Sequence, residues 1–417
     1  MNLTHIAGTD CQRLPRWMEQ FGWLLVASFV LLQPLGHLFE LPIAIMACLG
    51  LWLTLTQRRA VMALPALRPL LLIFACIWFP MLISLTDAVN LPRAAQTTLV
   101  FLRFPFAAIF AIRVLAAPIA RDRLLMATGV GVSFAALSVV ILTMAGHSMD
   151  GRVNIGFPVG HILAVLSPIY FYWLWRMGQQ RRWIWVAAPF YIMAILFSGA
   201  RVAWIMLAVG MALLLVQMFW VEKVRWRWKT AMVLILLAGI GIGAAVYNPG
   251  LKARVMQTAG LFSGDYEKTN AATSLRLPIW GVALRMAEDH WMNGVGPRGF
   301  RYLYEQYAKP GDPFIVNDRN TGATHPHQLL LEVVTETGVI GLVGYLAALF
   351  YWLRLCLTAA RTGVKPALPW MAAALVAIMP INAHMAFYAS FWSCISWWLI
   401  AVGLAYWQAG SVKERVN

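Results

Sequence analysis

Two arginines and one histidine in this chain could together perform a group transfer. Arg201 follows a short Ser-Gly-Ala connection between two apolar runs, Arg276 lies in a long polar loop, and His327 opens the apolar run after that loop. An arginine stays protonated and can donate two hydrogen bonds at once to two phosphate oxygens. A histidine titrates near neutral pH and can accept a proton from a hydroxyl. These residue types indicate transfer from a phosphate-bearing leaving group to an alcohol.

Each of these residues also has a simpler interpretation. Arg201 could anchor a helix at the membrane boundary, Arg276 could be a solvated surface charge, and His327 could bond a carbonyl. His325 and His327 could also join the 288–290 segment, Glu-Asp-His, as metal ligands. Two histidines that flank a proline seldom converge on one ion. We therefore expect no metal and no other cofactor, and we assign phosphate neutralisation to arginine.

The composition indicates a protein that crosses a membrane many times. Of the 417 residues, 61% are hydrophobic and only 12% are charged, and the chain contains 20 tryptophans and 21 phenylalanines. A soluble domain of this length would need far more polar surface. We therefore expect one integral membrane domain over residues 1–417.

Apolar runs long enough to cross about 30 Å of hydrocarbon are the elements that must position these side chains. They predict an all-α polytopic membrane protein with about 12 transmembrane helices. The predicted spans are 18–36, 39–56, 69–86, 97–116, 124–146, 156–175, 183–198, 201–220, 230–247, 327–353, 367–384 and 386–408.

The distribution of basic residues predicts the orientation of these spans. Counted over the termini and the short connections, twenty Lys and Arg fall on the side of the N-terminus. Only Arg93, Arg152 and Arg201 fall on the other side. Because basic residues are retained in the cytoplasm, both termini are expected inside and the long loop outside. The net charge of +16 is then a topological signal, and no nucleic-acid partner is expected.

The long outer loop, residues 248–326, is expected to form a small cap with short helices. Ser274 could cap a helix whose apolar face includes Leu275 and Ile279. Phe300 and Tyr304 mark a second short amphipathic helix. The loop then returns to the membrane at the tenth span.

Four further side chains are candidates for substrate binding. Arg103, inside the fourth span, could snorkel outward or meet a lipid phosphate. Arg152 and Arg298 could bind phosphates of either substrate, or could be solvated. His325 lies next to His327 in the sequence.

Two glutamates, Glu332 and Glu336, lie one turn apart in the tenth span. A carboxylate inside a membrane must be paired or protonated. We expect packing or helix-orienting roles for both. The alternative is that Glu332 orients His327 through a hydrogen bond.

The region around His327 also carries a wider pattern. His327-Gln328 is followed, after nine residues, by Gly338-Val339-Ile340-Gly341. This spacing resembles the signature of the O-antigen ligase family. The stretch 325–332 is similar to the core that these ligases share with O-antigen polymerases.

The arginines extend this resemblance to most of the chain. Arg201 and Arg276 fall where the family has its essential arginines, and twelve spans with one large loop between the ninth and tenth match as well. His161 stands where many relatives carry asparagine, which leaves a role for that position open.

The resemblance implies a fold related to the C-type glycosyltransferases and a metal-independent, inverting ligation. The donor would be an O-antigen polysaccharide on undecaprenyl pyrophosphate, and the acceptor a sugar hydroxyl of lipid A-core. His327 would be the general base, and Arg201 and Arg276 would hold the pyrophosphate. The chain would lie in the bacterial inner membrane among its lipids, with a periplasmic loop and a periplasmic active site.

Three other functions remain open at this point. An O-antigen polymerase would use the same donor but attack with another lipid-linked chain. A protein O-oligosaccharyltransferase would need a protein hydroxyl as the acceptor. A transporter would place ionisable pairs or broken helices near the middle of the bilayer and would show paired halves, whereas this chain shows no internal repeat.

Overall fold

The computed structural model describes residues 13–145, 158–223, 249–316, 322–383 and 385–414, together with the single glycines at 239 and 243. Within these ranges the chain forms helices and turns without any strand. The prediction of an all-α protein is therefore confirmed.

The first part of the chain forms the helices that precede the long outer loop. These are α2 (Arg16–Leu31), α3 (Glu40–Thr56), α4 (Arg58–Met62), α5 (Leu67–Ile83), α6 (Leu91–Phe101), α7 (Arg103–Val114), α8 (Pro118–Met144), α9 (Val159–Gly178), α10 (Ala187–Phe197) and α11 (Arg201–Val216).

The second part begins with five short helices and ends with three helices of the bundle. The short helices are α13 (Pro249–Ala259), α14 (Tyr266–Ala272), α15 (Arg276–Asp289), α16 (Phe300–Tyr307) and α17 (Pro313–Val316). The bundle is completed by α18 (Leu329–Arg361), α19 (Leu368–Ile378) and α20 (Ser390–Glu414).

Seven helical segments of the described chain are long and apolar enough to cross a membrane. They are Gln33–Thr56, Leu67–Asp87, Leu91–Val114, Pro118–Met144, Arg201–Val221, Leu329–Arg361 and Ser390–Gly410. Eleven of the predicted spans overlap helices, and the remaining one, the ninth span at 230–247, lies outside the described residues apart from two glycines. The predicted number of about twelve crossing helices is not confirmed. The apolar helices α10 and α19 have only 11 residues each, or roughly 16 Å at 1.5 Å per residue.

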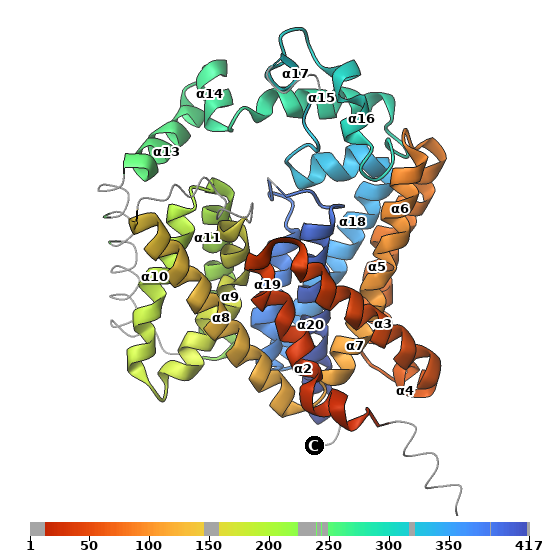
Figure 1. Cartoon of the computed structure of the whole chain (residues 1–417), viewed down its shortest axis with the longest axis vertical. Helices are drawn as coiled ribbons and strands as arrows, with labels where there is room; N and C mark the ends of the chain where they lie inside the picture. The colour runs from red at the N-terminus through yellow and green to blue at the C-terminus, as the bar shows by residue number, and fades with distance from the viewer. Residues whose placement is uncertain are drawn as a thin grey trace, which may run out of the picture.

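The five short helices form a cap over one end of the bundle (Figure 1). The cap has an apolar core of its own beside the much larger core of the bundle. Its buried side chains are Ile279, Val282, Ala283, Met286, Val295, Phe300, Leu303, Tyr304 and Ala323. In Figure 1 the described chain begins and ends at the opposite end of the bundle, as expected if both termini face the same side.

The predicted helices of the loop are present, but the start of the first one differs from the prediction. Ser274 and Leu275 both have left-handed backbone conformations, with φ of 62° and 61°. Ser274 therefore does not cap α15, and Leu275 is 46% exposed instead of lying on the buried face. Ile279 is buried as predicted.

The helix α18 is broken at Gly338, and the cap fills the break. Gly338 has a φ of 63°, so the regular hydrogen bonds around it are lost. The N–H of Val339 donates to the Trp291 carbonyl instead (2.8 Å). The carbonyls on the other side of the break accept from the turn of the cap, Val295 N to Thr335 O (2.9 Å) and Gly296 N to Glu336 O (3.0 Å). The cap turn thus satisfies backbone groups that a buried helix cannot leave unpaired.

We predict that Gly338→Ala destabilises the protein much more than Gly363→Ala does. Both glycines have a left-handed backbone, which costs a residue with a Cβ about 1–2 kcal/mol. A Cβ at Gly338 would also lie 2.0 Å from the Met292 carbonyl oxygen, whereas one at Gly363 would meet nothing within 4 Å. The fraction of monodisperse protein after heating in detergent measures the difference. Equal midpoints for the two variants would contradict this account of the break.

Candidate functional site

His327 lies in a tightly held turn at the start of α18. Its backbone is left-handed, with a φ of 52°, a conformation that is strained for a non-glycine residue. The next residue, Gln328, caps α18 by accepting from the Leu331 N–H (2.6 Å) and donates its side-chain amide to the Pro380 carbonyl (2.9 Å). The Leu329 N–H donates to the Asn382 carbonyl (2.9 Å). These contacts fix the backbone from which the histidine projects.

The structure brings His325 and His327 together. Their ring centroids are 3.8 Å apart, with the rings inclined by 40°. Nδ1 of His325 also lies 3.0 Å from the Thr324 hydroxyl. The alternative metal site is not formed, because no three His, Cys, Asp or Glu residues in the described part of the chain could hold one ion. Asp289 instead accepts a hydrogen bond from the Tyr307 hydroxyl (2.8 Å).

Arg201 and Arg276 are each the first residue of a helix, α11 and α15 respectively. Arg201 donates to the Ser274 hydroxyl, which lies just before α15. The Nη1 atom of Arg201 is buried without a hydrogen-bond partner among the described residues. The free N–H groups and the dipole of a helix N-terminus favour an anion. Two arginines therefore begin helices whose N-termini favour negative charge, and the bond to Ser274 brings Arg201 close to the start of α15.

The electrostatics of Arg276 show how close the two arginines are. Burial lowers the pKa of Arg276 to about 10, and the positive charge of Arg201 lowers it further in the same direction. At neutral pH the side chain remains protonated. An anion placed between the two arginines would raise the pKa of Arg276 again. Its negative charge would stabilise the buried guanidinium and offset the repulsion from Arg201.

Two further residues of this region were not predicted as site residues. Arg254, on α13, interacts electrostatically with Arg201, and a Cβ added to Gly199 would lie 4.0 Å from its Nε atom. His161, on α9, is 3% exposed and lies within electrostatic range of Arg276. No motif marks Arg254, since it lies in a polar segment far along the chain from Arg201. His161 is the third residue of α9 and could have been suspected only from the family pattern.

Arg103 lies in a different group of contacts inside the bundle. Its guanidinium is 3.6 Å from a Glu40 carboxylate oxygen and donates to the Ser390 hydroxyl (2.6 Å) and to Sγ of Cys394 (3.2 Å). It also lies 5.0 Å from the centroid of the Phe104 ring. Arg103 thus links α3, α7 and α20. Arg152, the other candidate in this part of the chain, lies outside the described residues.

The two glutamates of α18 hold neighbouring backbone segments. Both are fully buried. The Glu332 carboxylate accepts from the N–H groups of Phe387 (2.9 Å) and Tyr388 (3.2 Å), and Glu336 accepts from the N–H of Arg298 (2.6 Å). These contacts give both residues the expected packing role.

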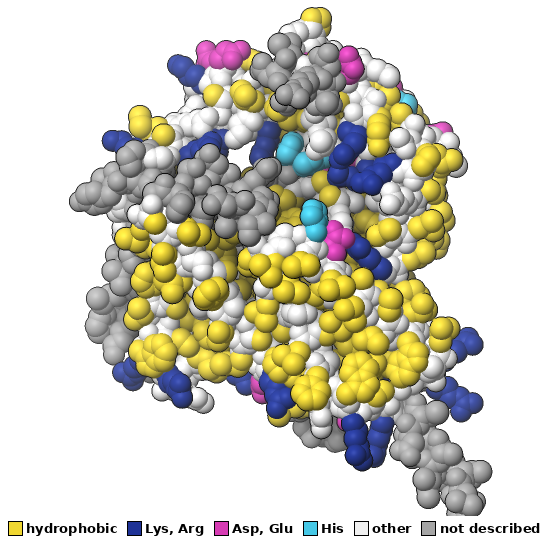
Figure 2. Space-filling view, viewed as in Figure 1, with side chains coloured by type: hydrophobic (Ala, Val, Ile, Leu, Met, Phe, Trp, Pro, Cys, Tyr) yellow, Lys and Arg dark blue, Asp and Glu magenta, His cyan; other side chains and the backbone are white. Residues whose placement is uncertain are grey.

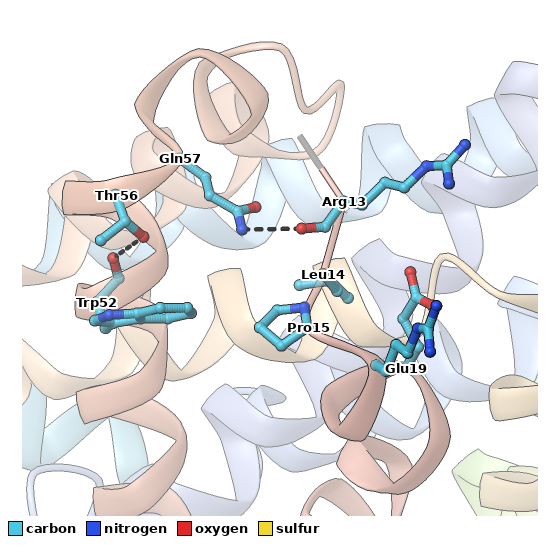
Figure 3. A pocket seen from close by; sticks show the side chains of 8 residues that line it. Arg13, Leu14, Pro15, Glu19, Trp52, Thr56 and Gln57 are labelled. Atoms are coloured by element: carbon cyan, nitrogen blue, oxygen red, sulfur yellow. Dashed lines mark hydrogen bonds between the residues drawn. The ribbon is translucent and has the colours of Figure 1, made fainter. Parts of the chain in front are cut away.

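A cavity of about 520 Å³ lies at the other end of the bundle, away from all these residues. Figure 3 shows Trp52 facing Pro15 across it, with the Gln57 amide donating to the Arg13 carbonyl (3.0 Å). It is formed by the start of α2 and the end of α3. Because no site residue lines it, it does not belong to the candidate site.

Residues 186–346 match the model of the family described as O-Antigen ligase. This range contains Arg201, Arg276, Arg298, His325 and His327, and it ends within α18 just after the break. The resemblance that the motifs indicated is therefore confirmed. A comparison with curated protein sequences found no match.

We predict that Gln328→Ala loosens the turn that carries His327. It removes the cap of α18 and the bond to Pro380, at a cost of about 1 kcal/mol for the cap alone. Hydrogen exchange of the 324–331 segment should become faster. The control is Gln306→Ala, the same change at an exposed position of α16. If both variants kept wild-type protection in that segment, Gln328 would not hold the turn.

Proposed function

We propose that the protein, whose residues 186–346 match the O-antigen ligase family model, transfers an O-antigen polysaccharide from undecaprenyl pyrophosphate to lipid A-core. The observation that carries the proposal is the meeting of Arg201 and Arg276 at the starts of α11 and α15. Two partly buried guanidinium groups at helix N-termini match the charge and the oxygen geometry of a pyrophosphate.

In this proposal Arg201 and Arg276 bind the pyrophosphate of the donor. As the bond between the anomeric carbon and the phosphate oxygen breaks, its electron pair stays on that oxygen and negative charge builds up there. Preorganised positive charge at such a position is usually the largest single contribution to catalysis. The family's link to lipid-linked polysaccharides supports this choice of donor.

His327 is the proposed general base. It takes the proton from a sugar hydroxyl of the acceptor while that oxygen attacks the anomeric carbon from the face opposite the pyrophosphate. One glycosidic bond forms, one carbon–oxygen bond breaks, and the configuration inverts through an oxocarbenium-like transition state. The fixed turn around His327 supports this role, because a base must be held within hydrogen-bond reach of its proton.

The reaction would take place on the periplasmic face of the bacterial inner membrane. The distribution of basic residues supports this orientation, with both termini in the cytoplasm and the cap outside. The proposal needs no metal ion, since the arginines supply the positive charge, and it is consistent with a fold related to the C-type glycosyltransferases.

We predict that purified protein in liposomes forms conjugated lipid in the presence of EDTA, and that His327→Ala protein does not. The substrates are polysaccharide-loaded undecaprenyl pyrophosphate and lipid A-core, and the products are resolved on a gel. A ladder of conjugated lipid from the wild type alone is the expected result. Longer donor chains without conjugated lipid A would identify a polymerase instead, and glycosylated protein would identify a protein O-oligosaccharyltransferase.

We further predict that Arg201→Ala and Arg276→Ala each slow ligation by about 10²–10³-fold. This loss should be comparable to the loss of a positioned base, about 10²–10⁴-fold for His327→Ala. The control is Arg354→Ala, which removes an exposed arginine from the far end of α18. Near wild-type rates for both site arginine variants, with only His327→Ala inactive, would rule out the pyrophosphate assignment.

A further inference from the structure

A second group of arginines lies at the other end of α15. Arg298 is in the turn that docks on α18, Arg301 is in the first turn of α16, and Arg93 is in the first turn of α6. We call these three residues the second arginine cluster. The turn and α6 are in direct contact, because the Val89 N–H donates to the Val295 carbonyl (3.1 Å). Figure 2 shows Lys and Arg side chains gathered beside a histidine where the cap overlies the bundle.

Arg301 lies close enough to Arg298 and Arg93 to be affected by the charge of both. The pKa of Arg301 is lowered, first by burial and then by the charge of Arg298, with a smaller contribution from Arg93 in the same direction. The negative charge of Glu336 acts in the opposite direction on Arg301. Like charges are therefore gathered here in spite of their repulsion.

Several guanidinium N–H groups of the second arginine cluster have no hydrogen-bond acceptor among the described residues. Nη1 of Arg298 and Nε of Arg301 are buried and have no hydrogen-bond partner among the described residues. Arg93 is exposed, and its guanidinium bonds only the neighbouring Gln96 (3.1 Å) within the described chain. Buried donors of this kind are normally paired, so these atoms are available to a ligand with several acceptor oxygens.

The two carboxylates nearby do not neutralise the cluster. Both carboxylate oxygens of Glu332 accept from the backbone N–H groups of Phe387 and Tyr388. Glu336 accepts a hydrogen bond from the backbone N–H of Arg298 (2.6 Å). With three guanidinium groups against two buried carboxylates, an excess of positive charge remains.

The position of the cluster fits a lipid headgroup. Arg93 is near the outer end of the candidate span Leu91–Val114. Apolar side chains beside it on the same span are open to the surroundings, including Leu91 (53% exposed) and Leu99 (64% exposed). Charge at the end of a span above an exposed apolar surface is the arrangement that a phosphate-bearing lipid requires, with its headgroup above its acyl chains.

The donor pyrophosphate cannot occupy both groups of arginines at once. The 14 residues of α15, roughly 20 Å at 1.5 Å per residue, lie between Arg276 at the start of the helix and the turn that leads to Arg298. A pyrophosphate is much shorter than this. The transfer reaction has a second lipid substrate, and the second group of arginines follows the opposite end of α15 from the first.

We propose that the second arginine cluster binds a phosphate group of the acceptor glycolipid. This inference rests on the proposed function, which supplies a phosphorylated lipid as the acceptor. Binding there holds the acceptor at the membrane surface on the α6 and α16 side, while the donor is held on the α11 and α15 side. The break at Gly338 keeps the two sites at a fixed separation, because it joins the cap turn to α18.

The test compares wild-type protein with the double variant Arg93→Gln plus Arg301→Gln. Arg298 is left in place because it has a left-handed backbone, with a φ of 67°, in the turn that docks on α18, and a substitution there would disturb the turn. The matched control is Arg354→Gln at the exposed far end of α18. Direct binding of lipid A-core to protein in nanodiscs is measured without donor, using phosphorylated and dephosphorylated lipid A-core. Ligation kinetics at saturating donor are measured in parallel.

The double variant should bind phosphorylated lipid A-core about tenfold or more weakly, since charge-assisted hydrogen bonds to phosphate are lost. The acceptor KM should rise by a similar factor, with kcat and the donor KM unchanged. Dephosphorylated lipid A-core should bind the wild type and the double variant equally.

Three results would overturn the inference. Equal binding of phosphorylated lipid A-core by the wild type and the double variant would exclude the cluster as its site. An equal loss of binding to phosphatidylglycerol nanodiscs would show a general anionic lipid site. A rise in the donor KM would assign the cluster to the donor. Because binding is measured without ligation, a failure of the proposed function leaves this test intact.

Discussion

The break in α18 at Gly338 is the constraint on which the rest of the outer face depends. The left-handed glycine separates backbone groups that a continuous helix would pair. The turn of the cap pairs them instead, through Val295 and Gly296 on one side and Trp291 on the other. A buried helix cannot leave these groups unpaired, so the break and the cap require each other. The cap is therefore joined to the bundle through the backbone, in addition to side-chain packing.

This joint determines where the charges of the cap lie. The turn follows α15 directly, so docking it on α18 fixes one end of α15, and the bond from Arg201 to Ser274 ties down the other end. The turn at His327 is held by Gln328 at the start of the same broken helix, α18. Two groups of arginines and one histidine thus occupy fixed positions along α15 and α18. A site for two charged lipid substrates needs such fixed spacing more than it needs a deep cavity.

Many of these helices could be predicted from the sequence, because apolar runs and amphipathic periodicity are direct signals of helices. The helices α15 and α16 were predicted from such periods, and His327 was predicted to open α18. The glycine at 338 was recognised as part of a motif, but its contact with Met292 depends on a turn far along the chain. For the same reason, the sequence did not predict that Arg254 lies near Arg201, since the two residues are far apart along the chain. The start of α15 was wrong in detail, since Ser274 adopts a left-handed conformation and bonds an arginine instead of capping the helix.

The central claim is that Arg201 and Arg276 hold the donor pyrophosphate in front of His327. The most direct measurement is a cryo-EM map of the protein in nanodiscs with undecaprenyl pyrophosphate bound. The account predicts phosphate density between the starts of α11 and α15, in contact with both guanidinium groups. Density for the pyrophosphate at Arg93 and Arg301 instead, with none at Arg201 and Arg276, would contradict it.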